Sequence, residues 1–414
     1  MLFDGGRSMS RTAIAAGSPE FKRTNRALFF GGFSSFALLY CVQPLMPVMA
    51  QQFALTPAQS SLSLSVATGA LALSLLVSGV LSDRLGRKPL MVAAMATAAL
   101  MTLLCAFAQD YHQLLLMRAA LGVALGGMPA VAMAYLSEEI EPASLGLSMG
   151  LYISGSAFGG MVGRVLTSVL SDFLSWRVAL AAVGIAGLLA AVEFWRSLPA
   201  SRNFRPVQGG WPALAGGLRQ HLGDDGLPWL FALAFLLMGC FVSAYNYIGY
   251  RLLAAPYHLS QSLVGAISFL YLIGIFSSVW AGKLADKLGR RGVLWIVMTV
   301  MGAGLLLTLA ENLLLVVAGM ALATFGFFAS HSIASSWVGR RARAPQALAS
   351  ALYLFFYYLG SSLVGWLCGL AWSRGGWAGV VLLLAIFLSL ALLIALRLRK
   401  LLPIGSATPS LAAT

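Results

Sequence analysis

The sequence predicts an all-α membrane protein whose twelve transmembrane helices form two pseudo-symmetric six-helix bundles. Hydrophobic residues make up 59% of its 414 residues and charged residues only 10%, whereas soluble domains carry about 25% charged residues. Uncharged stretches fill most of the chain, and crossing a bilayer takes about 20 apolar residues. A ten-residue loop sequence also occurs twice, once in each half, which indicates an internal repeat.

The first two spans are predicted to form a tight hairpin. Residues 27–82 contain no charged side chain, and they are interrupted by Pro44, Pro47 and the polar segment 51–57. The same criterion places the other ten spans near residues 89–108, 113–136, 145–170, 177–195, 227–250, 262–282, 292–310, 312–336, 347–372 and 377–396.

The distribution of Lys and Arg predicts the orientation, because basic residues in short loops stay on the cytoplasmic side. With both termini inside a bacterial inner membrane, every Lys and Arg lies in a cytoplasmic segment except Arg118, Arg164, Arg177, Arg251 and Arg374. The predicted order is a cytoplasmic tail (1–26), a six-helix bundle (27–198), a cytoplasmic linker (199–226), a second bundle (227–400) and a cytoplasmic tail (401–414).

The repeated loop joins the second and third spans of each half. The first copy runs from Gly79 to Lys88 and the second from Gly282 to Arg291, with Gly, Leu, Asp, a base, Leu, Gly and two bases in the same order. On this motif the chain resembles the major facilitator superfamily, from about Lys22 to Leu402.

The resemblance implies that these loops form a cytoplasmic gate, in which Glu138 or Glu139 pairs with Arg87. The simpler alternative is that the basic residues only fix the topology. The implied gate residues are Gly79, Asp83, Arg84, Gly86, Arg87 and Lys88 in the first copy, and Gly282, Asp286, Gly289 and Arg290 in the second.

Two further segments are similar to family motifs. The fifth span resembles the glycine-rich helix of the family's antiporters, with Ser156 where proline is usual, and plain helix packing is the alternative. Arg118 begins a segment that resembles the Arg-x-x-Gln-Gly motif. It is either a functional residue or a side chain that reaches to the outer interface. The glycines of the proposed fifth-helix hinge are Gly150, Gly155, Gly159 and Gly160.

The resembled fold lines a central cavity with its first, fourth, seventh and tenth helices, and substrate sites in such repeats lie near the bilayer midplane. Aromatic and amide side chains in these helices are therefore candidates for substrate binding, although membrane aromatics often contact lipid instead. The candidates in these four helices are Phe36, Tyr40, Gln43, Tyr245, Asn246, His331 and the arginine Arg118, and to them we add Tyr152 of the fifth span and Tyr357 of the eleventh.

The sequence thus predicts an alternating-access transporter rather than an enzyme, with no cofactor, metal site or nucleic-acid partner. The chain is similar to bacterial drug and arabinose-efflux-like permeases, which implies a monomeric exporter of small molecules that exchanges them for protons. His331 is the candidate proton-binding group; the alternatives are that it is a neutral packing residue, or that Glu138 or Glu139 takes up the protons. The alternative is uptake or exchange of a small organic anion, because Arg118 and Arg164 lie in spans that contain no balancing carboxylate.

Overall fold

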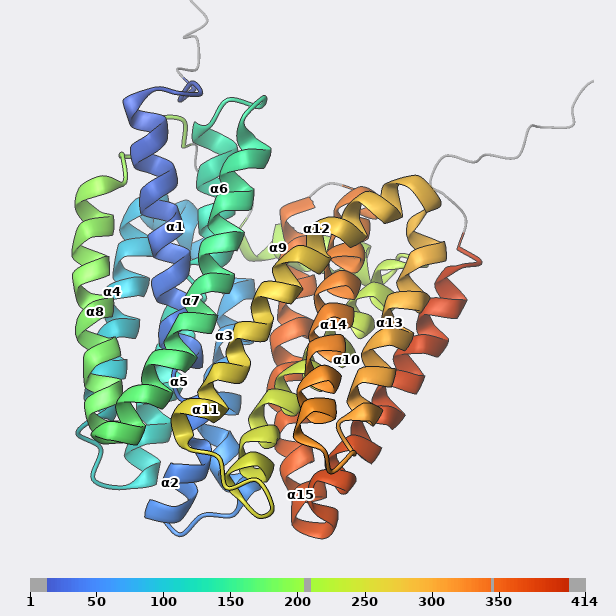
Figure 1. The fold of residues 1–414 in the computed structure, drawn as a ribbon. Helices are drawn as coiled ribbons and strands as arrows, with labels where there is room; N and C mark the ends of the chain where they lie inside the picture. Colours follow the sequence, from blue (N-terminus) through green and yellow to red (C-terminus); the bar gives the residue numbers. More distant parts are fainter. Residues whose placement is uncertain (1–12, 205–209, 344–345, 402–414) are drawn as a thin grey trace, which may run out of the picture.

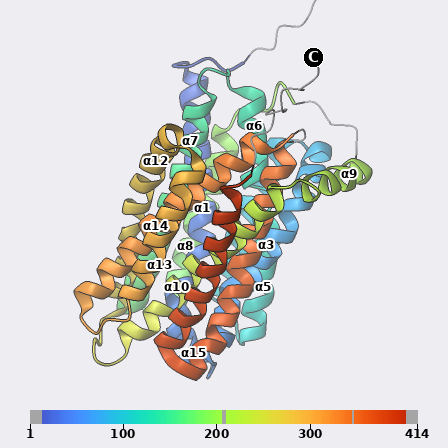
Figure 2. The same cartoon turned by 90° about the vertical axis from the view of Figure 1, so that its right-hand side faces the viewer.

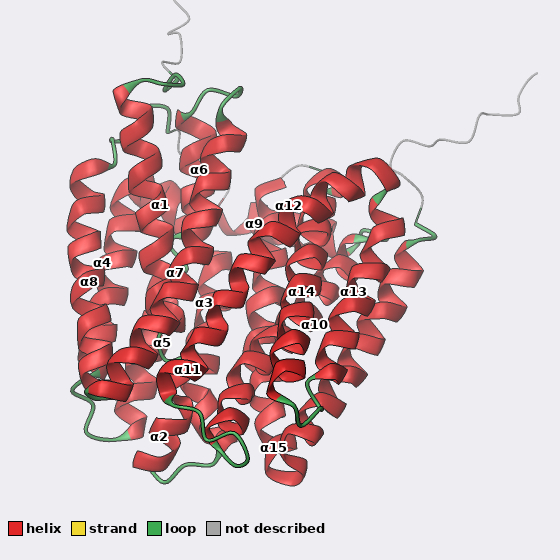
Figure 3. Ribbon diagram, viewed as in Figure 1, coloured by secondary structure: helices red, strands yellow, loops and turns green. Residues whose placement is uncertain are grey.

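The computed structural model describes residues 13–204, 210–343 and 346–401, and within them all regular structure is helical apart from a single bridge between Ile14 and Ile140 (Figure 3). The first half contains α1 (Pro19–Tyr40), η1 (Gln43–Leu45), α2 (Met46–Gln52), α3 (Pro57–Leu85), α4 (Arg87–Cys105), α5 (Tyr111–Leu125), α6 (Pro129–Glu139), α7 (Leu145–Phe173) and α8 (Trp176–Ser197). Then follow α9 (Gly210–Leu222), α10 (Leu227–Leu253), α11 (Gln261–Ala266), η2 (Ile267–Leu270), α12 (Tyr271–Leu288), α13 (Arg290–Leu307), α14 (Leu313–Arg341) and α15 (Gln346–Leu398).

Eleven continuous helical stretches of the described residues are long and apolar enough to cross a membrane, and the last of them crosses twice. α15 contains 53 residues, which at 1.5 Å per residue would be about 80 Å long, far beyond the ~30 Å hydrocarbon core. Its helix is broken at Gly375 and Gly376, where Gly376 has a φ of 54°. The prediction of twelve spans is therefore confirmed.

The helices form two bundles, one from α1 to α8 and the other from α10 to α15 (Figure 1). The helix α9 lies between them in sequence and projects sideways (Figure 2). Across the halves, α3 packs against α15 and α7 against α11. The predicted terminal tails fall largely outside the described residues, since 1–12 and 402–414 are not described.

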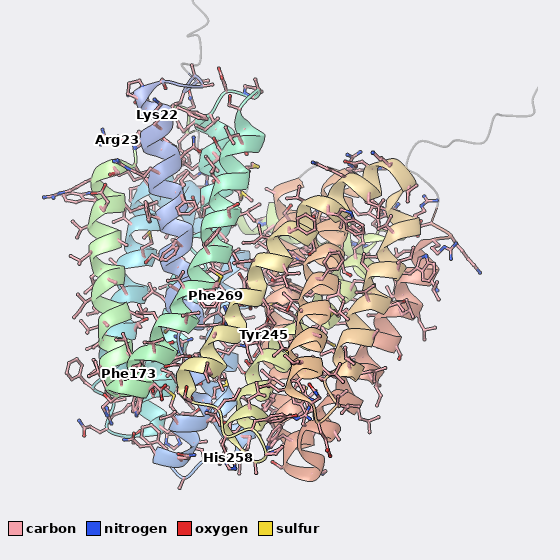
Figure 4. All side chains as sticks on the ribbon, viewed as in Figure 1. Lys22, Arg23, Phe173, Tyr245, His258 and Phe269 are labelled. Carbon is pink, nitrogen blue, oxygen red and sulfur yellow. The ribbon has the colours of Figure 1, made fainter. Side chains whose placement is uncertain are left out.

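We call the end of the molecule where α1 begins the N-side, and the opposite end the far side. Lys22 and Arg23 lie at the N-side, whereas Phe173 and His258 lie at the far side (Figure 4). Both copies of the repeated loop are at the N-side. In each, a single glycine turns the chain from one span into the next, Gly86 with a φ of 87° and Gly289 with a φ of 83°. Only glycine adopts this conformation without strain.

At the N-side of the second half, Asp224 fastens the start of α10 to the end of α14. Its carboxylate accepts hydrogen bonds from the backbone amides of Gly226 and Leu227, both at 2.8 Å, and pairs with Arg341 at 2.5 Å. Burial alone would raise the pKa of Asp224, but the hydrogen bonds from Arg341 and the two amides hold it below its ordinary value. The carboxylate therefore stays ionised near neutral pH and caps α10.

Glycines allow α1 and α7 to touch backbone to backbone. A Cβ atom added at Gly155 would overlap the carbonyl oxygen of Phe29, and one added at Gly159 would overlap that of Phe33. Gly150, in the same helix, meets nothing within 4 Å. In this conformation, then, Gly155 and Gly159 serve close helix packing, as small residues commonly do in membrane helices.

We expect Gly159→Ala to destabilise the protein by about 1–3 kcal/mol, because α1 must move away from α7 to admit a methyl group. The matched control is Gly150→Ala, which adds the same methyl group to the same helix in open space. Thermal unfolding of the detergent-solubilised protein measures both. Equal melting temperatures for the two variants would contradict the close packing of α1 on α7.

Candidate functional site

The first copy of the repeated loop holds a buried arginine between three helices. Arg87 is 6% exposed and pairs with Asp83 at 2.8 Å and with Glu138 at 2.7 Å, and it also donates to the Ser82 hydroxyl at 2.7 Å. These partners lie on α3 and α6, and all belong to the first half. The described contacts therefore fix α3, α4 and α6 to one another and do not bridge the two halves.

The second copy repeats the pair with a different surrounding. Arg290 pairs with Asp286 at 2.8 Å and donates to the Ser336 hydroxyl at 3.2 Å, while Arg340 approaches Asp286 at 3.5 Å. The Asp–Arg spacing of four residues is thus the same in both loops. No described carboxylate on α14 takes the place that Glu138 has on α6.

Of the two predicted partners for Arg87, Glu138 is the one in contact, and Glu139 has another role. Glu139 is 1% exposed and accepts hydrogen bonds from the backbone amides of Arg202 at 2.7 Å and Asn203 at 2.8 Å. It therefore holds the segment that follows α8. Lys88 donates to the carbonyl oxygen of Leu198 at 2.5 Å and supports the same segment. The other predicted loop residues are open, since Arg84 is exposed and a Cβ atom at Gly79 or Gly282 would meet nothing.

A second arginine is buried where the two halves meet. Arg164, on α7, is 2% exposed, and its guanidinium carbon lies 4.3 Å from the ring centre of Tyr40 and 4.8 Å from that of Tyr271. Its Nη1 donates to the carbonyl oxygen of Gly160 at 2.6 Å, and its Nε donates to the Gln43 side chain. No described Asp or Glu forms an ion pair with Arg164.

Gln43 connects this arginine to the other half. Its Nε2 donates to Oδ1 of Asn246 at 2.6 Å and to the carbonyl oxygen of Val242 at 3.3 Å, both on α10. Gln43 opens the short 3-10 turn η1, and Pro44 follows it. Because proline cannot continue the hydrogen-bond ladder of a preceding helix turn, the first span breaks here and Gln43 reaches across. We call Tyr40, Gln43, Arg164, Asn246 and Tyr271 the Arg164 cluster.

Aromatic rings of the second half lie next to this cluster. Tyr245, placed within the bundle in Figure 4, has its ring centre 5.3 Å from Tyr271 and 5.0 Å from Phe241. Phe241 stacks on Phe327 at 3.9 Å, and Phe327 stacks on His331 at 5.8 Å. The aromatic rings therefore run without a break from α12 through α10 to α14.

His331 ends this row of rings. Its Nδ1 is 2.9 Å from the Tyr353 hydroxyl, and its ring centre is 4.9 Å from that of Tyr357. Both His331 and Tyr357 are partly exposed. On the first half, Phe36 is also partly exposed and lies 6.0 Å from Tyr40.

Most of the predicted substrate residues are thus brought together, but Arg118 and Tyr152 are not part of the Arg164 cluster. Arg118 is 1% exposed, and it donates only to backbone carbonyl oxygens of the first half, those of Ser63 at 2.8 Å, Leu38 at 3.0 Å and Leu39. It cross-links α5 to α3 and α1. Tyr152 is buried, and its ring packs close to Gly32 of α1.

Arg164 and Tyr271 were absent from the predicted cavity. A signal for Arg164 existed, because an arginine within a span and without a nearby acid indicates a functional site. Tyr271 gave no such signal, since it follows the 3-10 turn η2, which shifts the helical register that a sequence pattern assumes.

The far side holds the halves together. Asp172 of α7 accepts from the backbone amide of Ser262 at 3.1 Å and from its hydroxyl at 2.6 Å, and so binds the start of α11. Gln261 donates to the carbonyl oxygen of Pro44, and the hydroxyls of Ser60 and Tyr250 are hydrogen-bonded. Within the described residues, no hydrogen bond joins α1–α8 to α10–α15 at their N-side ends.

Comparison with known sequences identifies the family. A sequence model described as Major Facilitator Superfamily matches residues 28–252 and again residues 247–413. The chain belongs to the major facilitator superfamily. It is therefore a membrane transporter rather than an enzyme, as predicted.

Members of this superfamily resemble the chain over nearly its whole length. The inner membrane transport protein YnfM of Escherichia coli is 51% identical over 94% of this chain and 93% of its own. The MFS-type transporter YybF of Bacillus subtilis is 47% identical over 92% of this chain and 94% of its own. Among solved structures, a bacterial homologue of the human lysosomal transporter Spinster, inward-facing and unoccupied, has a TM-score of 0.76 at 15% identity and covers 92% of this chain and 98% of its own. That likeness confirms the fold.

We expect Asp172→Asn to loosen the far side of this transporter, because the variant replaces a charged acceptor at the start of α11 with a neutral one. The contact is solvent-exposed, so the population open at the far side should rise only about two- to fivefold. Spin labels at Gln109 and Glu311, one exposed position on each half, report that opening as a longer distance.

The control for this experiment is Asp110→Asn. Asp110 also caps a far-side helix and accepts from the amide of Gln113 at 2.9 Å, but both residues belong to the first half. It should leave the distance unchanged. An equal shift in both variants would show that Asp172 has no special role between the halves.

Proposed function

We propose that this protein is an alternating-access secondary transporter that exports a small organic anion across the bacterial inner membrane. The observation that supports this proposal is the buried guanidinium of Arg164, which has no described carboxylate partner and lies where the two halves meet. The sequence left open a proton-coupled exporter of small molecules and a transporter for uptake or exchange of a small organic anion. This proposal takes the direction from the first and the substrate class from the second.

The preference follows from electrostatics. Removing a charge from water costs several kcal/mol even after relaxation. The Gln43 side chain and the faces of Tyr40 and Tyr271 recover part of this cost by hydrogen bonding and cation–π contact, but none of them carries a negative charge. A bound anion would neutralise the guanidinium, whereas a bound cation would add a second positive charge.

The orientation rests on the basic residues. They gather in the N-side loops, so we assign the N-side to the cytoplasm. The similarity to YnfM, an inner membrane transport protein, supports location in the inner membrane. With this orientation, the described hydrogen bonds between the halves lie in the middle and at the far side and none at the cytoplasmic ends, which supports entry of an exported substrate from the cytoplasm.

The repeated loops serve the opposite state in this proposal. When the N-side closes, Asp83 and Arg87 and their counterparts Asp286 and Arg290 come together across the halves and hold it shut. Two observations support this role of the loops: the Asp–Arg ion pair already formed in each half, and the resemblance of the motif to that of the family. A Cβ atom added at Gly150 or Gly160 would not overlap backbone atoms of a neighbouring helix. These two glycines of the fifth span therefore remain candidates for a hinge.

Membrane potential supplies the driving force for export of an anion. Moving one elementary charge through 100 mV is worth about 2.3 kcal/mol, and the cytoplasm is the negative side. Export of a monovalent anion therefore needs no titrating side chain, whereas its uptake would need a coupled cation. This agrees with the placement of every Asp and Glu in loops or near span ends.

We expect an anion to carry current through the reconstituted wild-type protein on a solid-supported membrane. The probes are acetate, gluconate and benzenesulfonate, each compared with its neutral counterpart, acetamide, glucose or benzenesulfonamide. Arg164→Gln should lower the anion-evoked current at least about tenfold, the effect of losing one charge-assisted contact.

The control is Arg177→Gln, because Arg177 also donates to backbone carbonyl oxygens of the first half, at 2.9 and 2.8 Å, but lies outside the Arg164 cluster. It should keep the wild-type current. Absence of current with every anion, or a full current in Arg164→Gln, would refute anion export through this site.

Proton coupling is tested with His331, the predicted proton-binding group. If potential alone drives export, His331→Gln should leave anion accumulation in proteoliposomes unchanged, and a pH gradient without a potential should drive none. If a pH gradient drives accumulation in the wild type but not in His331→Gln, the transporter is a proton antiporter and the potential-driven mechanism is wrong.

A further inference from the structure

Both polar atoms of the Gln43 side-chain amide are hydrogen-bonded, and each has a different role. Its Oε1 accepts from Nε of Arg164, and its Nε2 donates to Asn246 and Val242 of the other half. Gln43 is 2% exposed, so these contacts are shielded from bulk solvent. The group that occupies the arginine is therefore also one of the groups that tie the two halves together.

We propose that the transported anion displaces Gln43 from Arg164, and that this displacement releases the bond between the halves and lets the far side open. Gln43 is thus a positioning residue that couples occupancy of the site to the gate. The inference rests on the proposed anion site at Arg164 and adds to it the step by which binding changes the conformation.

Displacement is favourable because a charged acceptor is stronger than a neutral one. Hydrogen bonds between guanidinium and carboxylate or sulfonate oxygens are roughly twice as strong as neutral ones. The amide oxygen of Gln43 holds the place only while no anion is bound. Gln43 itself keeps alternative partners, since an amide can turn its donor and acceptor toward other groups.

Unused hydrogen-bonding groups around Gln43 support a second arrangement. The Tyr40 hydroxyl and Nδ2 of Asn246 are buried and have no hydrogen-bond partner. Each such group costs about 1–3 kcal/mol, so the present arrangement is not fully satisfied. Tyr40 carries the ring that the Arg164 guanidinium covers, and its hydroxyl is a donor available to an anion there.

Release of Gln43 affects the far-side contacts between the halves because Pro44, the next residue, also takes part in them. The carbonyl oxygen of Pro44 accepts from Gln261 of α11, so two consecutive residues of η1 bind the second half through α10 and α11. The 3-10 turn lacks the regular α-helical ladder. Movement of Gln43 therefore passes directly to the Pro44 contact.

Two substitutions separate the two tasks of Gln43. In Gln43→Glu a permanent carboxylate occupies Arg164 and cannot donate to Asn246, so benzenesulfonate should bind at least about tenfold more weakly while the far side opens without ligand. In Gln43→Met the competitor and the bond between the halves are both removed. Benzenesulfonate should then bind more tightly, and the far side should open as well.

The experiment measures benzenesulfonate affinity by calorimetry on the full-length protein in detergent and the distance between spin labels at Gln109 and Glu311 on the same samples. The native cysteines do not interfere, because all four are buried. The matched control is Tyr250→Phe, which removes the far-side bond to Ser60 without touching Arg164. It shows how much affinity changes when the seam alone is loosened, and Gln43→Met should exceed it.

The wild-type protein provides a test without any substitution at Gln43, since saturating benzenesulfonate should lengthen the Gln109–Glu311 distance and benzenesulfonamide should not. Unchanged affinity in Gln43→Glu would overturn the displacement, and an unchanged ligand-free distance in Gln43→Met would overturn the coupling. Those results leave anion export standing. If no anion binds the wild type or evokes a current, the proposed function itself fails, and this inference fails with it.

Discussion

One buried positive charge determines how the middle of this protein is built. Arg164 lies between two bundles with no described acid beside it, and every neighbouring group compensates it incompletely. Gly160 and Gln43 accept hydrogen bonds from it, and two tyrosine rings cover its faces. A neutral shell leaves the charge itself unbalanced, so binding of an anion stabilises the site further. Gln43 is held in place by an interaction that a ligand can replace.

The two halves share the loop motif but differ in charge, and the difference lies at the N-side. Asp83 and Arg87 match Asp286 and Arg290, yet Glu138 on α6 corresponds to Ser336 and Arg340 on α14. The second half therefore has an excess of positive charge at its N-side end. Basic residues around an entrance raise the local concentration of anions, so this asymmetry agrees with entry of an anion from the cytoplasm.

The sequence predicted the fold and the loop motif well, because both depend on local rules. Span length fixed the helices, and Gly86 and Gly289 occupy turns that only glycine tolerates. The partner of Arg87 was predicted as Glu138 or Glu139, and three-dimensional packing decided between two adjacent carboxylates that point to different segments.

The central site was predicted only in part, because it depends on which way a helix turns. Arg118 and Arg164 look alike in sequence, since each is an arginine within a span. Arg118 faces the interior of its own bundle and donates to backbone carbonyl oxygens of α1 and α3. Arg164 faces the other half. The 3-10 turns η1 and η2 change the facing of Gln43 and Tyr271, and no periodic pattern carries that information.

The contacts within each bundle differ from those between the bundles, and this difference explains why a bundle stays rigid while the contacts between the bundles break. Inside a bundle, helices touch through glycines such as Gly159 and Gly360, where backbone meets backbone over a long surface. Separating them would expose polar backbone and leave voids that nothing fills. The far-side seam also has a close glycine contact, Gly369 of α15 against the backbone of Ala58 on α3. Its other contacts include a few side-chain hydrogen bonds, each worth about 1 kcal/mol, from residues such as Asp172, Gln261 and Gln43. Rigid-body rocking of two bundles requires that the contacts between them break while those inside each bundle hold. A ligand that removes one of those few bonds therefore shifts the equilibrium between the two states. Loss of one hydrogen bond inside a bundle would shift it little.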